Sequence, residues 1–490
     1  MSKKVTTDAK GYPKFGMIDK VAYAAGDFGC NMSFSLKGTV QTFWLVFMML
    51  ETGLLSALLL VVQIWDAIND PMIGSMIDAD RRKYKLGKFK TYILIGAIGL
   101  LVAGSLVFIP VPKAPVLIKA IVFIVGYLIW DACYTVANVP YGSMLSLVTE
   151  DAGERAQLST WRSVGSMVGG MLPGILLPFL IWEKVVDESG NPVLNPETGE
   201  QVQRLLGERV FFAALLMGVL GFIAFMFMIK KITIRVDEQT VKTNDSEKFN
   251  VIKAFGNFMK NRPAVGATIA AMGMFLGMQS ATTATQVMFA IYFGQAQLSG
   301  VVQLVGFLPM FLFMPFIKKI VGKFGKKEAS VAGTLVSLLG GVLMFIFPLI
   351  SNKGAALALY MAALCIFGLG MGIYTCVSWA LMADAIDYNE WKTGKREEGT
   401  VYSLHSFFRK LAQGVGPAAV LLIMGFLGYD ADLGVGAQSA ATANSMCWLV
   451  AALYLLSAVM QFVGLVLVYN LDKKTMDKMN AELAARKTAA

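Results

Sequence analysis

The sequence is poor in charge, because Asp, Glu, Lys and Arg make up only 16% of its 490 residues. An ordinary soluble domain is about 25% charged, so this composition argues against a water-soluble globular protein. The chain has one histidine, and its five cysteines all lie in apolar runs without a Cys-x-x-Cys pair. The sequence therefore supports neither a disulfide framework nor a zinc site of ordinary ligand spacing.

Apolar residues make up 56% of the chain and fall in long runs separated by short charged stretches. A membrane-spanning helix needs about 20 mostly apolar residues. We predict an all-α membrane protein with 12 transmembrane helices, at 20–49, 52–77, 91–110, 115–147, 160–182, 209–230, 264–294, 297–321, 329–350, 355–383, 400–427 and 444–470.

Lysine and arginine concentrate in alternate loops. The 78–90 loop and the 230–262 segment are rich in them, whereas the 111–118 loop has one and the 428–443 loop has none. The positive-inside rule then predicts that both termini are cytoplasmic. The net charge of +10 is explained by this topology, so we expect no nucleic-acid partner and a multi-pass location in a bacterial-type inner (plasma) membrane.

The basic middle segment divides the predicted spans into two six-helix halves. Gly87-Lys88-Phe89 follows the second span and Gly322-Lys323-Phe324 follows the eighth, which indicates an internal repeat, with coincidence as the alternative. A repeat of this kind predicts a substrate site near mid-membrane. The predicted parts are a cytoplasmic N-terminus 1–19, an N-terminal bundle 20–230, a cytoplasmic linker 231–263, a C-terminal bundle 264–470 and a cytoplasmic tail 471–490.

Ionisable residues inside apolar runs are costly and need a partner or a function. The second span contains Asp66, Asn69 and Asp70, which share one helix face because they are three and four residues apart. Two carboxylates held together repel, and a proton or a small cation relieves the repulsion. Oxygen ligands suit a hard cation, so Asp66 and Asp70 are candidate ligands for Na⁺. A salt bridge to another helix is the alternative.

The fourth span places Asp131, Thr135 and Asn138 on one face, with Tyr134 beside them. Thr135 and Asn138 are candidates for a cation shell or for hydrogen bonds to sugar hydroxyls. Asp131 is a candidate second acid near that site. Ordinary hydrogen bonding between helices is the alternative for all of them.

The first span contains Asp27, and the fifth span contains Arg162 beside Trp161. A buried carboxylate can accept two sugar hydroxyls, and an arginine offers a rigid fork of donors. We expect Asp27 and Arg162 to contact a sugar. An ion pair between them in the empty protein is the alternative, and it would not exclude that role.

The eleventh span contains His405, Arg409 and Lys410. Lys410 is a candidate to neutralise Asp66 or Asp70 across the two halves. His405 is either a substrate-binding group or an ordinary, satisfied interior histidine.

The tenth span ends in Asp384 and Asp387. We interpret them as gate residues that form salt bridges with basic loop residues, and solvated loop charges are the alternative. The candidate basic partners are Arg81, Arg82, Arg155 and Arg396.

These motifs resemble the glycoside–pentoside–hexuronide:cation symporters, a branch of the major facilitator superfamily. The most specific element is Asp66-Ala-Ile-Asn-Asp-Pro71 with its Gly87-Lys88-Phe89-Lys90 tail, and the resemblance extends over nearly the whole chain. It implies a major facilitator fold. It also implies four sugar contacts, Asp27, Tyr134, Asn138 and Arg162, and a cation region of Asp66, Asn69, Asp70, Thr135 and Lys410.

Two positions depart from the pattern of the melibiose-transporting members. Asn138 replaces an aspartate shared between cation and sugar, and Gly142 replaces a tryptophan that packs on the sugar. The first change lowers the negative charge of the cation shell, which leaves both Na⁺ and H⁺ as coupling ions, and the second admits a larger or different glycoside.

We therefore expect a secondary active transporter that couples Na⁺ or H⁺ to a sugar or glycoside by alternating access, as a monomer in the bilayer. We expect no cofactor and no enzymatic activity. A cation-coupled carrier of lysolipids or other amphiphiles has the same fold, but Asp27 and Arg162 argue against it. A membrane-embedded sensor belongs to another class and would want a signalling domain longer than the tail 471–490.

Overall fold

The computed structural model describes residues 12–149, 151–236, 251–312, 316–394 and 398–489. It is almost entirely helical, which confirms the predicted all-α class. The chain divides into two compact units: unit 1 is Met1–Glu183 with Arg204–Asp245, and unit 2 is Lys184–Gln203 with Ser246–Ala490. The domain limits predicted from the sequence stay a prediction.

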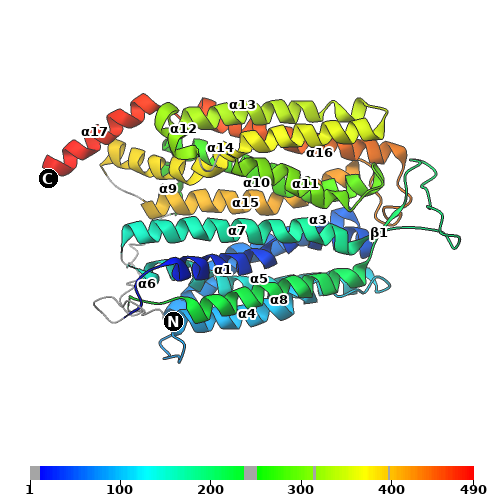
Figure 1. The fold of residues 1–490 in the computed structure, drawn as a ribbon, viewed down its shortest axis with the longest axis horizontal. Helices are drawn as coiled ribbons and strands as arrows, with labels where there is room; N and C mark the ends of the chain where they lie inside the picture. Colours follow the sequence, from blue (N-terminus) through cyan, green and yellow to red (C-terminus); the bar gives the residue numbers. More distant parts are fainter. Residues whose placement is uncertain (1–11, 150, 237–250, 313–315, 395–397, 490) are drawn as a thin grey trace, which may run out of the picture. The chain divides into compact units, whose positions relative to one another are not determined.

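The long helices of unit 1 lie side by side (Figure 1). Its helical elements are α1 (Met17–Phe34), α2 (Leu36–Thr42), the π-helix η1 (Phe43–Phe47), α3 (Thr52–Ala79), α4 (Lys88–Leu106), α5 (Val116–Ser143), α6 (Leu145–Val148), α7 (Ala152–Ile181) and α8 (Gly207–Lys231). Two short strands, β1 (Trp182–Lys184) and β2 (Gln203–Leu205), pair with each other.

Unit 2 is a second helical bundle (Figure 1). Its elements are α9 (Val251–Lys260), α10 (Arg262–Ile291), α11 (Leu298–Phe307), η3 (Leu308–Phe311), α12 (Ile317–Phe324), α13 (Lys326–Met344), η4 (Phe347–Leu349), α14 (Lys353–Thr393), α15 (Glu398–Phe426), α16 (Ala440–Phe462), the π-helix η5 (Val463–Val468) and α17 (Lys473–Ala489).

Among the described residues, ten helices are long and apolar enough to cross a membrane. They coincide with ten of the twelve predicted spans. The other two predictions, 20–49 and 297–321, fall on helical segments that are divided into short pieces. In the first, α1 ends at Phe34 and the chain continues as α2 and η1; in the second, α11 is followed by η3 and α12. The count of twelve therefore stays a prediction, as does the side on which the termini lie.

Small residues bring the helices of unit 1 close together. Helix α1 packs against α7 and α8, and α4 packs against α5. A Cβ atom on Gly165 of α7 would overlap the backbone carbonyl of Ala24 on α1. Small residues at such crossings let helices approach closely within a membrane. This close approach also brings Arg162, which lies one turn before Gly165 on α7, beside α1.

The segment between β1 and β2 belongs to unit 2, although its ends continue into α7 and α8. The Asn195 side chain donates to the Gln438 carbonyl at 3.1 Å, and this bond is buried. The Gln203 side chain donates to the Gly294 carbonyl at 2.6 Å. Hydrogen bonds from the middle and from the last residue of 184–203 therefore join this segment to the rest of unit 2.

Candidate functional site

Asp27 of α1 and Arg162 of α7 form an ion pair inside unit 1. The distance from Arg162 Nε to Asp27 Oδ1 is 3.3 Å. The Asp27 side chain is 8% exposed, whereas that of Arg162 is 36% exposed, so the guanidinium is the more accessible partner. Ser166 also hydrogen-bonds the Asp27 carboxylate. The structure thus brings together the two residues that we expected to contact a sugar. They form the ion pair that the sequence analysis gave as the alternative.

Two tyrosines adjoin this ion pair. The Cζ atom of Arg162 lies 5.1 Å from the ring centroid of Tyr141. Tyr141 in turn stacks on Tyr23, with centroids 4.8 Å apart, and its hydroxyl donates to the Tyr23 carbonyl at 2.8 Å. The guanidinium is therefore held between a carboxylate and a fixed aromatic ring, which is a suitable setting for a polar ring-shaped ligand.

A second group of polar side chains lies between α3 and α5. Asn69 Nδ2 donates to Thr135 Oγ1 at 2.9 Å and to Asp131 Oδ2 at 3.2 Å. The Thr135 hydroxyl donates to Asp70 Oδ1 at 2.8 Å. Asn69, Thr135 and Asp131 are almost completely buried. We call Asp66, Asn69, Asp70, Asp131 and Thr135 the acidic cluster.

Asp66 joins the acidic cluster through Asp131, because the two carboxyl groups lie within electrostatic reach of each other. In the part of the chain that the structure describes, no set of three His, Cys, Asp or Glu side chains is placed to hold a metal ion. A sodium ion at the cluster would therefore need the amide and hydroxyl oxygens of Asn69 and Thr135 as well. The buried Asn69 Oδ1 has no hydrogen-bond partner and is available for such a role.

Helix α5 connects the ion pair with the acidic cluster. Tyr134 is within electrostatic reach of Asp27 and Arg162 as well as Asp70, and it precedes Thr135 of the cluster. Asn138 lies one turn later and is half-buried. A Cβ atom on Gly142 would meet nothing within 4 Å, so open space adjoins this position.

Three candidate residues of unit 2, His405, Arg409 and Lys410, lie on α15. His405 is buried, its Nδ1 is 2.9 Å from Thr268 Oγ1, and its ring packs edge-on against Trp379. Arg409, one turn later, lies 4.8 Å from the centroid of Trp379 and 5.4 Å from that of Phe275. Lys410 follows and is half-buried. Its predicted pairing with Asp66 or Asp70 would join the two units and stays a prediction.

Asp384 of α14 has a partner within unit 2. Lys326 Nζ donates to Asp384 Oδ1 at 2.6 Å, and the Asp384 side chain is only 6% exposed. Asp387 is half-buried one turn further along the same helix. From the sequence we expected arginines as partners for Asp384, and we did not identify Lys326.

The predicted basic gate residues lie in or near loops. Arg81 is exposed, and Arg82 is 84% exposed, with its Nε 4.0 Å from Asp80. Arg155 donates from Nε to the Thr149 carbonyl at 2.9 Å. Arg396 lies outside the described residues. Their role as gate partners stays a prediction.

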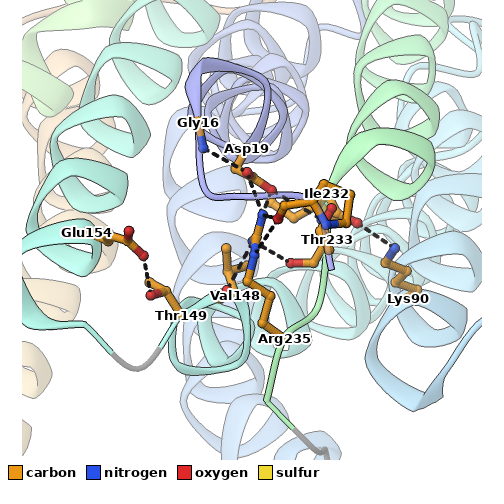
Figure 2. A network of polar contacts seen from close by, with 10 residues as sticks. Gly16, Asp19, Lys90, Val148, Thr149, Glu154, Ile232, Thr233 and Arg235 are labelled. Atoms are coloured by element: carbon orange, nitrogen blue, oxygen red, sulfur yellow. Dashed lines mark hydrogen bonds and ion pairs between the residues drawn. The ribbon is translucent and has the colours of Figure 1, made fainter. Parts of the chain in front are cut away.

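A polar network at one end of unit 1 was not expected from the sequence (Figure 2). Arg235 donates to both carboxylate oxygens of Asp19, at 2.9 and 3.2 Å, and to the carbonyls of Val148 and Thr233. The side chains of Arg235 and Asp19 are 9% and 1% exposed. This network ties the segment after α8 to α1 and to α6.

Sequence reasoning also missed Lys37 on α2. It considered acids and several basic residues within spans but not this lysine, although a cation in the apolar run 20–49 is equally costly. The lysine is within electrostatic reach of Asp66, Asp70 and Asp131. By contrast, an aromatic residue in an apolar run has no distinguishing pattern, so the position of Tyr141 could be found only from the structure.

Comparison with known proteins supplies a family assignment. A family model described as "MFS/sugar transport protein" matches residues 22–473. An uncharacterized symporter of Bacillus subtilis, YjmB, is 29% identical over 96% of this chain and 95% of its own length. An isoprimeverose transporter of Lactiplantibacillus pentosus is 29% identical over 87% of this chain and 83% of its own length. A glucuronide carrier protein homolog of Escherichia coli is 26% identical over 84% of each chain.

Solved structures agree in fold. The crystal structure of a D-xylose–proton symporter has a TM-score of 0.59 and 15% identity, with 91% of this chain and 96% of that chain covered. At that identity the likeness concerns the fold alone. The predicted major facilitator fold is therefore confirmed.

Proposed function

Because the chain belongs to the MFS/sugar transport protein family, and is thus a multi-pass inner-membrane sugar transporter rather than an enzyme, we propose that it performs cation:sugar symport. One observation supports the proposal above others. The neighbours Tyr134 and Thr135 on α5 belong to two different polar groups, the first near the Asp27–Arg162 pair and the second within the acidic cluster. A displacement of this one helix turn therefore shifts a side chain in each of the two groups.

The substrate proposed is a sugar or glycoside that binds between Asp27 and Arg162. The carboxylate of Asp27 accepts hydrogen bonds from neighbouring hydroxyls, and the partly exposed guanidinium of Arg162 donates to ring or glycosidic oxygens. The Tyr141 ring fixes the guanidinium plane. Among relatives, the names isoprimeverose transporter and glucuronide carrier homolog also describe glycosidic cargo.

The coupling ion proposed is Na⁺ or H⁺ at the acidic cluster. Asp66 and Asp70 provide the charge, and Asn69 and Thr135 provide neutral oxygens. Neutralising this charge removes repulsion between carboxylates and fixes α3 against α5. An ordered α5 then holds Tyr134 in place for the sugar. Coupling of this kind is reciprocal, so bound sugar tightens ion binding by the same factor.

Transport requires that the occupied site open to one side of the membrane and then to the other. We propose alternating access, in which the ion and the sugar together favour the transition. When an ion is bound without sugar, the ion pair between Asp27 and Arg162 stays formed. This restraint limits leakage of the coupling ion down its gradient.

The test is uptake into proteoliposomes with imposed gradients. Galactosides, xylosides and glucuronides are offered in turn, under a Na⁺ gradient or a proton gradient. We expect one class to accumulate above equilibrium, and accumulation to disappear in Asp66→Asn and Asp70→Asn. Asp432→Asn, at an exposed loop position, is the matched control.

Two outcomes would contradict the proposal. Undiminished gradient-driven accumulation in both cluster variants would mean that the coupling ion does not bind at the acidic cluster. Unaltered sugar binding by Asp27→Ala and Arg162→Ala would mean that the sugar does not bind at the ion pair.

A further inference from the structure

Lys37 lies on the first turn of α2, just after the interruption that ends α1 at Phe34. Its ammonium is 4.8 Å from the ring centroid of Phe34, and it forms a hydrogen bond with Tyr127. Phe34, Lys37, Trp130, Asp131 and Tyr134 line one small pocket. The lysine therefore lies beside Asp131 of the acidic cluster.

The positive charge of Lys37 acts on the three acids of the acidic cluster. Asp66, Asp131 and Asp70 are all within its electrostatic reach. An ammonium at membrane depth is costly and persists only where interior groups compensate it. Three carboxyl groups beside one lysine provide this compensation, and the lysine in turn reduces repulsion among them.

A small cation at the acidic cluster would encounter the same lysine. Na⁺ and an ammonium group have equal charge and seek the same carboxylate oxygens, so each weakens the binding of the other. The buried Oδ1 of Asn69 has no partner, although Asn69 Nδ2 donates twice within the cluster. That oxygen is a ligand that a free cation would gain and that the tethered ammonium leaves unused.

We infer that the ammonium of Lys37 is a built-in counter-cation of the acidic cluster and that it weakens Na⁺ binding there. The inference rests on the proposed function for its physiological meaning, since it concerns how strongly the acidic cluster holds a coupling cation. Lys37 acts through the acidic cluster, so it is a positioning residue.

The direct test is Na⁺ binding to the purified protein in lipid nanodiscs. Binding of radioactive Na⁺ is measured at constant ionic strength and pH, with choline as the replacement cation. We expect Lys37→Met to bind Na⁺ at least about fivefold more tightly than the unaltered protein, the lower end of ordinary coupling between sites. Lys37→Arg retains the charge and should behave like the unaltered protein.

Lys119→Met is the matched control. Lys119 is also a buried lysine of unit 1, but its ammonium donates to the Met48 carbonyl at 2.6 Å. This variant should leave Na⁺ affinity unchanged. The double variant Lys37→Met/Asp131→Asn removes one charge of each sign and should lose the gained affinity. Equal Na⁺ affinity of Lys37→Met and the unaltered protein would overturn the inference.

A second variant tests the inference if Lys37→Met fails to fold. Lys37→Gln removes the charge but keeps a polar side chain, and we expect it to bind Na⁺ more tightly than the unaltered protein in the same assay. Equal Na⁺ affinity of Lys37→Gln and the unaltered protein would overturn the role of Lys37. Absence of accumulation under any gradient would instead contradict the symport proposal, while the direct binding comparison would still decide the role of Lys37.

Discussion

Arg162 faces two groups at once: its Nε lies 3.3 Å from Asp27 Oδ1, and its Cζ lies 5.1 Å from the centroid of Tyr141. A carboxylate holds the edge of the guanidinium, and an aromatic ring lies beside it. Lysine has the same charge but has neither the planar fork nor the flat face of the guanidinium. The contribution of this geometry can therefore be separated from that of the charge.

Arg162→Lys should weaken sugar binding roughly tenfold or more, because hydrogen bonds of the charged fork are lost. Binding of radiolabelled substrate to purified protein measures the effect. The control is Arg209→Lys at an exposed arginine of α8. Equal affinity in Arg162→Lys would mean that only the charge matters.

Thr135→Val should reduce gradient-driven accumulation by about tenfold or more, because the hydroxyl that donates to Asp70 at 2.8 Å is replaced by a methyl group of similar size. Sugar binding without an ion should change much less. Thr135→Ser retains the hydroxyl and serves as the control. A variant that still accumulates sugar normally would separate Thr135 from coupling.

Gly142→Trp should fold, because a side chain at this position enters open space. A ring there can pack on a compact pyranoside and tighten its binding by up to about tenfold. The same ring should obstruct a bulky glycoside. Competition uptake with a small and a large glycoside measures the ratio, and Gly142→Ala is the control. No change in that ratio would place position 142 away from the sugar.

Arg235→Gln should destabilise the protein, by about 3–5 kcal/mol where folding is reversible, because it leaves the buried Asp19 carboxylate without its partner. Thermal unfolding in detergent reports the loss as a lower midpoint temperature. Arg204→Gln is matched to it, since that ion pair with Glu183 is exposed at 64% and 43% and should contribute little. Similar midpoints for both variants would contradict the structural role of Arg235.

Asp80 links the end of α3 to the start of α4. Hydrogen bonds from the Tyr84 hydroxyl, the Arg82 backbone amide and the Tyr92 hydroxyl lower the pKa of Asp80 to about 2. Its stabilising effect is therefore present above the ordinary aspartate pKa of about 4 and is lost as the pH falls through about 2. The melting difference between Asp80→Asn and the unaltered protein should stay constant from pH 7 to 5 and shrink below about pH 4. A difference that changes between pH 7 and 5 would contradict this pKa.

Much of the site could be predicted, because the polar residues of a membrane-spanning helix are easily recognised in its sequence. Acids and amides stand out within apolar runs, and the helical period places Asp66, Asn69 and Asp70 on one face. The structure adds which groups meet: Thr135 forms hydrogen bonds with both Asn69 and Asp70, and Asp131 accepts one from Asn69 and lies within electrostatic reach of Asp66.

The remaining features depend on contacts between distant segments. Lys326 and Asp384 are 58 positions apart, and Asp19 and Arg235 are 216 apart, so no local period relates them. Lys37 was missed for another reason. Helix α1 ends at Phe34 and α2 begins at Leu36, so one uniform 3.6-residue period over 20–49 does not describe the side chains on both sides of the break.

Residues 184–203 link α7 to α8 but fold with unit 2 through Asn195 and Gln203. The chain thus crosses between units three times, after Glu183, Gln203 and Asp245. A protease cut within 231–263 would yield a first fragment that retains a piece of its neighbour's architecture. The second fragment, isolated, would present the carbonyls of Gln438 and Gly294 without the donors Asn195 and Gln203, which stay with the first fragment.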